Sequence, residues 1–150
     1  MPAPTTESHS PGRVRIELVD SAIDPQSLRE FLADPDCGAV AWFEGVTRRM
    51  TGNHETVDLT YEAFEPMATA QLRSLAAEAA ERFSLHRVAI THRLGTVPIG
   101  QASILIGISA AHRAGALAAL PWLMDRIKTD VTIWKRDRTV DGQTAWIHPQ

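Results

Sequence analysis

Cysteine is almost absent from this chain of 150 residues, which contains only Cys37. A single cysteine excludes an intrachain disulfide and a four-cysteine zinc site, and it points to a reducing, cytoplasmic compartment. Cys37 has no Cys-x-x-Cys partner and no cationic neighbour in the sequence. We therefore expect an inert thiol.

Long hydrophobic runs are also absent. The longest apolar stretch, residues 114–124, contains Pro121 and is too short to span a bilayer, so no membrane contact is expected. The formal net charge of −3 provides no long-range attraction for nucleic acid. With 44% hydrophobic and 22% charged residues, the composition is that of a folded globular protein. We predict a loose tail over residues 1–12 and one domain over residues 13–150.

The periodicity of the apolar residues predicts both strands and helices. Strands are expected at residues 13–19, 38–47, 56–63, 88–94, 102–109, 131–134 and 144–147, and helices at residues 24–32, 66–83 and 110–127. Strand 56–63 is expected to pair with the strand before it, and the polar or turn-rich segments 48–55 and 95–100 are expected to be loops. Ser109 is expected to cap the last helix, and Asp141-Gly142 to form a hairpin turn. Because strands outnumber helices without strict alternation, the predicted class is α+β with a mixed or antiparallel sheet.

Lysine is scarce as well. Thirteen of the fifteen basic residues are arginine, and the only lysines are Lys128 and Lys135. Both lie near Trp134 in the sequence, and Lys135 directly follows it. A lysine amine loses its proton readily when it is desolvated and can act as acid, base or nucleophile, whereas a guanidinium cannot. A functional amine explains the pattern, and two solvated surface lysines explain it equally well.

Two further segments could bind an anion. Residues 109–113 place His112 and Arg113 in the predicted first helical turn, where free N–H groups and the helix dipole favour phosphate. Residues 45–49 place Arg48 where a strand enters a loop. Solvated surface arginines fit both patterns too. His86 and His92 lack a third ligand, so no metal site is predicted.

Several segments, taken together, resemble the large, catalytic subunit of molybdopterin synthase. They are Phe43-Glu44-Gly45-Val46-Thr47-Arg48-Arg49, Tyr61-Glu62-Ala63-Phe64-Glu65-Pro66-Met67, His92-Arg93-Leu94-Gly95, Ser109-Ala110-Ala111-His112-Arg113, Met124-Asp125-Arg126-Ile127-Lys128-Thr129 and Ile133-Trp134-Lys135-Arg136. The segments occur in the family's order, and the resemblance extends over about residues 13–147. It implies that family's α/β-hammerhead-like fold within the α+β class.

The resemblance also implies an activity and partners. In this family a small ubiquitin-like subunit ends in Gly-Gly, whose terminal carboxylate has become a thiocarboxylate. Two such sulfurs convert cyclic pyranopterin monophosphate into the dithiolene of molybdopterin, in molybdenum cofactor biosynthesis. The implied assembly is a homodimer with one small subunit at each end, a heterotetramer. No metal or other cofactor is expected at this step.

The same resemblance assigns roles to individual residues. Lys128 and Lys135 are implied to be the catalytic amines, and Arg48, His112 and Arg113 to clamp the phosphate of the pterin. The full implied substrate-binding set is Val46, Thr47, Arg48, His112, Arg113, Lys128, Lys135, Arg136 and Asp137.

The chain departs from the family pattern at three positions. Met50 stands where the family often has histidine, Asp137 where it commonly has glutamate, and Ala145 where it commonly has arginine. The first change removes a polar contact expected near the mouth of the pocket. Arg138 is a candidate replacement for the missing late arginine.

The spacing of the site residues raises a geometric difficulty. His112 and Lys128 are about 24 Å apart along one predicted helix and lie on nearly opposite faces of it. A two-fold dimer that shares its sites would bring them together, so a shared site is predicted. Two other functions stay open on the residues alone: a Schiff-base lysine enzyme for a phosphorylated carbonyl substrate, and a non-catalytic module that binds an acidic partner tail.

Overall fold

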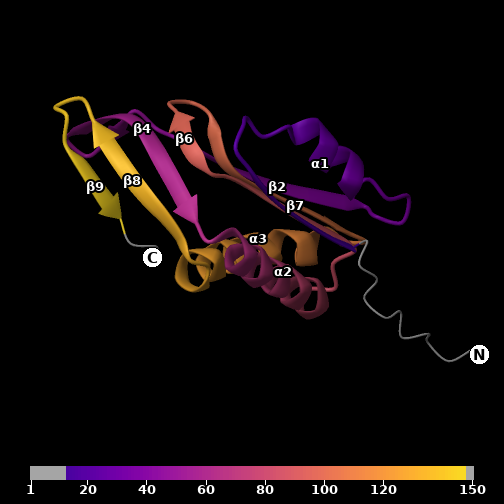
Figure 1. Ribbon diagram of the computed structural model, residues 1–150. Helices are drawn as coiled ribbons and strands as arrows, with labels where there is room; N and C mark the ends of the chain where they lie inside the picture. The colour runs from indigo at the N-terminus through magenta and orange to yellow at the C-terminus, as the bar shows by residue number, and fades with distance from the viewer. Residues whose placement is uncertain (1–12, 148–150) are drawn as a thin grey trace, which may run out of the picture.

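A four-stranded sheet lies at the centre of the computed structural model, which describes residues 13–147 (Figure 1). Its strands occur in the order β1 (Val14–Val19), β5 (Arg87–Arg93), β7 (Ala102–Ala110) and β2 (Ala39–Val46). Strand β1 runs parallel to β5, and the other neighbouring strands are antiparallel.

Helices cover both faces of this central sheet. Helices α2 (Glu65–Arg82) and α3 (Arg113–Asp130) pack on one face, and the short α1 (Pro25–Leu32) packs on the other (Figure 1). Along β7, Ile106 packs in the core cluster under α2 and α3. Its neighbour in the sequence, Leu105, points to the other face and packs in the cluster under α1. Alternate residues of β7 are therefore buried on opposite faces, which explains its continuous apolar sequence.

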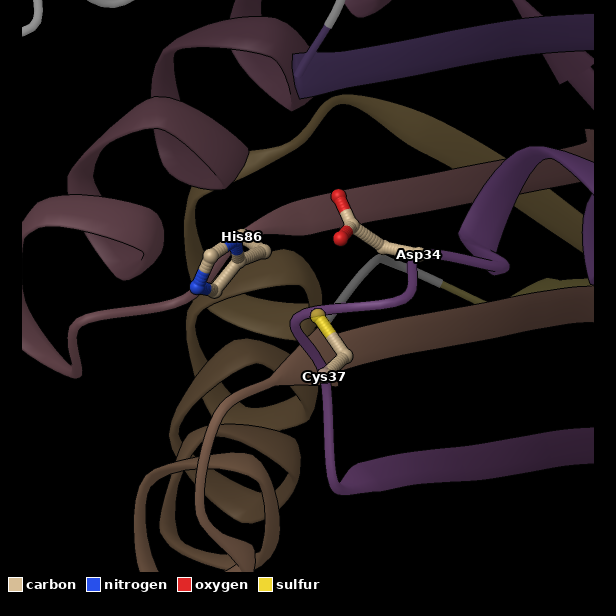
Figure 2. Close-up of side chains that lie close together, drawn as sticks. All are labelled: Asp34, Cys37 and His86. Atoms are coloured by element: carbon tan, nitrogen blue, oxygen red, sulfur yellow. The ribbon is translucent and has the colours of Figure 1, made fainter.

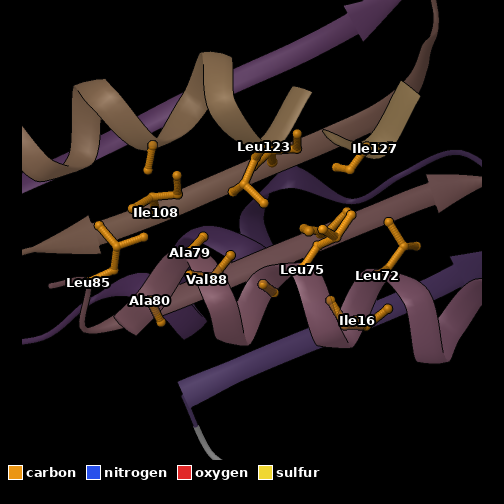
Figure 3. Packing of buried hydrophobic residues seen from close by; sticks show 14 of the residues in the cluster. Ile16, Leu72, Leu75, Ala79, Ala80, Leu85, Val88, Ile108, Leu123 and Ile127 are labelled. Atoms are coloured by element: carbon orange, nitrogen blue, oxygen red, sulfur yellow. The ribbon is translucent and has the colours of Figure 1, made fainter. Parts of the chain in front are cut away.

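The larger core cluster lies between the sheet and the two long helices (Figure 3). Leu72 and Leu75 of α2 face Leu123 of α3 and the central strands, and all three are buried. Burying a side chain of this size contributes about 1.5–3 kcal/mol. The core therefore fixes α3 against the sheet, and with it the position of the last helical turn.

A second sheet contains the last two strands of the chain together with three earlier ones. Its path is β3 (Met50–Thr51), β4 (His54–Ala63), β8 (Ile133–Thr139) and β9 (Thr144–Ile147), and β6 (Gly95–Pro98) also pairs with β4. The turn between β8 and β9 contains Gly142 at φ +83°, a conformation that glycine adopts without strain. This confirms the predicted hairpin turn and, with the helices above, the predicted α+β class.

Three sequence-based expectations about the strands were wrong. Strand β4 does not pair with the preceding β2: β2 pairs with β7, and β4 pairs with β6 and β8. The two expected loops contain the short strands β3 and β6, both of which pair with β4. These pairings depend on segments distant in the sequence, which local turn signals do not report.

The expected start of the last helix was also wrong. Strand β7 continues through Ala110, α3 begins at Arg113, and His112 occupies the N-cap position without a capping side-chain hydrogen bond. Ser109 is buried and pairs with Val40 on one side and Arg87 on the other. Strands on both sides hold Ser109 extended, so it cannot cap the helix. The helix continues through Pro121 to Asp130.

Candidate active site: a cation-lined cavity

A cavity of about 410 Å³ opens where the end of α3 meets both sheets. Its walls come from β2, β4, β5, β7, β8, β9 and the last turns of α3. The lining residues are Phe43, Gly45, Val46, Tyr61, His92, Ser103, Ile104, Met124, Ile127, Lys128, Val131, Ile133, Lys135 and Ile147. Both lysines of the chain are among them.

The chain reversal after α3 brings the two lysines into one cavity. Lys128 lies in the last turn of α3, and the helix ends where the Val131 N–H donates to the Ile127 carbonyl at 3.1 Å. The Thr132 N–H then donates to the Gln71 side-chain oxygen at 3.0 Å, which ties the connection to α2. Strand β8 starts at the next residue and presents Lys135 to the same cavity.

Lys135 lies in an environment that disfavours its charged form. Burial lowers the pKa of Lys135 because it removes water from the ammonium, and the positive charges of Lys128 and Arg48 lower it further. Asp137, two residues along the same strand, acts in the opposite direction and raises this pKa. The Asp137 carboxylate also accepts a hydrogen bond from Thr56 at 3.4 Å. The Lys135 ammonium is therefore a stronger acid than an ordinary lysine.

The end of β2 carries the next group of predicted site residues. Val46 lines the cavity, and Thr47 is almost fully buried. The Thr47 N–H donates to the Gln101 carbonyl at 3.0 Å, and the Gly100 N–H donates to the Thr47 carbonyl at 2.8 Å. These two backbone bonds fix the point at which the exposed Arg48 leaves the strand, near enough to Lys135 to affect its pKa.

Sequence reasoning missed a polar part of the cavity wall. Tyr61 and His92 line the cavity with their rings edge to face at a centroid distance of 4.9 Å, and Ser103 lies beside them. Burial lowers the pKa of His92 to about 4, so its ring is neutral at pH 7. Its Nδ1 lies 2.9 Å from the Arg93 carbonyl, which can only accept, so Nδ1 carries the proton and Nε2 is an acceptor.

A signal for this wall was present in the sequence. Tyr61 is the only tyrosine of the chain, and both Tyr61 and His92 belong to segments that carry the family resemblance. The pattern around His92 excluded only a metal site. The pairings of β4 with β8 and of β5 with β7 are needed to bring Tyr61 and His92 to the cavity.

Of the predicted site residues, Thr47, Arg48 and Asp137 adjoin the cavity without lining it, and three others lie farther away. His112 and Arg113 are exposed at the opposite end of α3 from Lys128, about 24 Å away along the helix axis. Arg136 lies between Lys135 and Asp137 on β8, so strand alternation turns it to the opposite face. There its guanidinium lies 5.2 Å from the centre of the Trp146 ring.

Arg138 does not replace the missing late arginine. It lies on the same face of β8 as Arg136, and its guanidinium donates to both carboxylate oxygens of Asp58, at 3.2 and 2.5 Å. Asp58 is nearly buried, so this bidentate pair keeps Arg138 on the outer face of the second sheet.

The arrangement is suited to a small anionic substrate. Arg48, Lys128 and Lys135 concentrate positive charge at one cavity, while Tyr61, His92 and Ser103 supply neutral hydrogen-bonding groups. Within residues 13–147, no set of three metal-ligating side chains lies in this cavity, and the one such set lies elsewhere. Among the same residues, no helix is long and apolar enough to cross a membrane. The fold and the cavity together define a small α+β enzyme whose candidate active site concentrates positive charge.

Comparison with known proteins gives the family. Residues 18–130 match the family model described as MoaE protein. The chain is 38% identical over 130 residues to an Arabidopsis thaliana protein named molybdopterin synthase catalytic subunit, covering 85% of this chain and 66% of that protein. It is also 38% identical over 143 residues to a Neosartorya fischeri protein of the same name, covering 95% and 76%. The chain belongs to the MoaE family, and the predicted resemblance is confirmed.

Solved structures agree with this assignment. The crystal structure of molybdopterin synthase from Staphylococcus aureus superposes with a TM-score of 0.82 at 35% identity, covering 87% of this chain and 95% of that chain. The MoaE protein from Burkholderia ambifaria superposes with a TM-score of 0.77 at 28% identity, covering 91% and 90%. The α+β fold implied by the resemblance is therefore confirmed.

Proposed function

We propose that this chain is a sulfurtransferase, the catalytic subunit of a molybdopterin synthase. It would take sulfur from the C-terminal thiocarboxylate of a small ubiquitin-like subunit and transfer it to cyclic pyranopterin monophosphate. The observation that carries the proposal is the meeting of Lys128 and the desolvated Lys135 in one cavity with Arg48 nearby. Both substrates are anions, and both need cations where they react.

The cavity residues divide the chemistry between them. The thiocarboxylate sulfur attacks a pterin carbon, and the oxygen that departs needs a proton. Water then hydrolyses the resulting thioester, so the sulfur stays on the pterin and the small subunit leaves with an ordinary C-terminal carboxylate. Lys135 would donate that proton, which its pKa, lowered by burial, supports, and Lys128 would hold the negative charge of the tail. Arg48 binds the phosphate at the entrance. Neutral His92 offers Nε2 as a hydrogen-bond acceptor for the pterin amines.

The proposed assembly is a homodimer that binds one small subunit at each end. His112 and Arg113 lie too far from Lys128 to act on the same small molecule within one chain. A two-fold axis can bring the exposed start of α3 from one copy to the lysine cavity of the other. A cytoplasmic location is part of the proposal and is supported by the free thiol of Cys37.

Reconstitution tests the activity directly. The purified chain is mixed with a thiocarboxylated small subunit and cyclic pyranopterin monophosphate, and the dithiolene product is measured. We expect product only when all three are present. The matched control replaces the thiocarboxylate with the ordinary C-terminal carboxylate, which should give none. Absence of product with the thiocarboxylated partner would contradict the proposal.

A further inference from the structure

A second group of reactive side chains lies away from the lysine cavity. Asp34 lies in the loop after α1, Cys37 two residues before β2, and His86 directly before β5. A carboxylate oxygen, the sulfur and a ring nitrogen of these residues all lie within 4.8 Å of one another. Figure 2 shows the three side chains around a common space. None of them lines the lysine cavity.

Backbone hydrogen bonds hold this cluster in place. The Cys37 N–H donates to the Asp34 carbonyl at 3.1 Å, and the Asp36 N–H donates to the Asp34 carboxylate at 2.8 Å, which together form a tight turn. The His86 N–H donates to the carbonyl of Ser109 at 2.8 Å. Both segments are therefore ordered before any ligand arrives, so binding would cost little conformational entropy.

The donor set has the chemistry of a zinc-type site. A thiolate, an imidazole and a carboxylate are the three ligand types that Zn²⁺ prefers, and three protein ligands leave a fourth position for water. Ligand atoms of a tetrahedral zinc site lie about 3.3–3.8 Å apart. Atoms already within 4.8 Å need to approach by about 1 Å, which small side-chain rotations on these two loops supply.

The charges around the cluster also favour a cation. Burial raises the pKa of the Cys37 thiol, and the charges of Asp34 and Asp36 raise it further, whereas a hydrogen bond with Ser109 lowers it. Among the charged groups that affect this thiol in the described part of the chain, only Arg87 is a cation, and its guanidinium lies 3.6 Å from a carboxylate oxygen of Asp34. With Cys37 as a thiolate, three negative charges would face one positive charge, so a divalent ion completes the balance.

We propose that Asp34, Cys37 and His86 bind a divalent transition metal of the zinc class. On binding, the Cys37 thiol releases its proton to solvent, its sulfur bonds the metal as a thiolate, and a water fills the fourth position. The Gly38 N–H donates to the Ala111 carbonyl at 3.2 Å, next to His112. The metal would therefore hold the start of α3 in place, at the far end of the helix from the catalytic lysines.

Cobalt titration of the untagged, reduced full chain tests this site. Co²⁺ bound to a thiolate gives a near-ultraviolet charge-transfer band, and we expect saturation at one equivalent and displacement by Zn²⁺. Cys37→Ser should abolish the band, and His86→Gln should weaken cobalt binding by at least about tenfold. His54→Gln, which removes an exposed histidine on β4, is the matched control and should bind like the wild type.

A second readout is thermal stability. Zn²⁺ should raise the Tm of the wild type and of His54→Gln, and should not raise the Tm of Cys37→Ser or His86→Gln, because a ligand stabilises only a fold that binds it. Circular dichroism shows whether Cys37→Ser and His86→Gln fold. The test can be carried out with either variant if only one of them folds. Absence of a thiolate band in the wild type, or a band unaffected by His86→Gln, would overturn the proposal.

Discussion

Lys128 and Lys135 line the same cavity from two different elements, and the positive charge of Lys128 lowers the pKa of Lys135. The short connection after α3 makes this relationship possible, because the chain turns back within a few residues from helix to strand. Like charges held together are costly in a fold and useful in a site that binds anions. The two amines are therefore the first targets for mutation.

Lys128→Ala should lower kcat for product formation by at least about 100-fold, because it removes a charge that acts in the transition state. Arg48→Ala should mainly raise KM for the pterin, because a phosphate clamp also holds the ground state. Steady-state kinetics with the thiocarboxylated partner measures both. Arg73→Ala removes an exposed arginine of α2 outside the cavity and should change neither. Equal kcat for Lys128→Ala and wild type would refute the catalytic role.

Lys135→Met should abolish turnover and stabilise the fold. The folded-state pKa of Lys135 is lowered, so the folded chain binds fewer protons than the unfolded chain between that pKa and 10.5. The free energy of unfolding therefore rises as the pH increases from the folded-state pKa to 10.5. Below the folded-state pKa, the buried ammonium destabilises the fold by its full amount. Removing the ammonium at pH 7 should add on the order of 1 kcal/mol.

Urea denaturation at pH 7 measures this gain. Arg73→Met is the matched control, because it removes an exposed cation of α2 and should change the free energy of unfolding by less than about 0.5 kcal/mol. A lower free energy of unfolding for Lys135→Met than for wild type would show that the buried ammonium does not destabilise the fold.

The free energy of unfolding should fall between pH 6.5 and about 4 because of His92. Its pKa is lowered from 6.5 to about 4 by burial, so over this range the unfolded chain takes up a proton that the folded chain does not. This single group should cost about 3 kcal/mol at the acidic end. His92→Gln does not titrate, so its free energy of unfolding should change less between pH 7 and 4.5.

Denaturation of both chains at the two pH values isolates this effect, because all other titrating groups are shared. His54→Gln serves as the comparison for an exposed histidine and should keep the wild-type pH dependence. If His92→Gln loses as much stability on acidification as wild type, His92 does not cause the loss.

Part of the candidate active site was predictable from composition and from the order of motifs. Lys128 and Lys135 were singled out because lysine is otherwise missing from the chain, and the structure brings both to one cavity. Tyr61 and His92 were missed as site residues because their positions depend on the long-range pairings of β4 and β5, which no local pattern encodes. Arg136 was predicted to flank the site, but its face of β8 depends on strand register, which became visible only in the structure.

Gly115→Ala should destabilise the fold although alanine is the better helix former. A methyl group at Gly115 would collide with the backbone carbonyl of Phe83, which cannot move without shifting the end of α2. The helix propensity gain of about 1 kcal/mol is smaller than the cost of the collision, and we expect a net loss of about 1–3 kcal/mol. Ala118→Gly, at an exposed position of α3, measures the propensity effect alone. A Gly115→Ala chain more stable than wild type would show that the Phe83 carbonyl can move away from a methyl group at this position at little cost.

Activity should reappear when two inactive variants are mixed, if the site is shared between copies. His112→Ala and Lys128→Ala are each expected to be inactive. After subunit exchange at equal amounts, half of the dimers are mixed, and each mixed dimer has one intact site and one doubly altered site. We expect about one quarter of wild-type activity. The measurement is product formation after exchange, compared with each variant alone.

The matched control for this mixture combines Lys128→Ala with Lys135→Ala. Both lysines line the cavity of a single chain, so every site in a mixed dimer lacks one of them and no activity should return. Recovery in the first mixture and not in the second would place His112 of one copy beside the lysines of the other. Background activity in the first mixture would instead mean that His112 acts elsewhere, because the length of α3 keeps it away from the lysine cavity of its own chain.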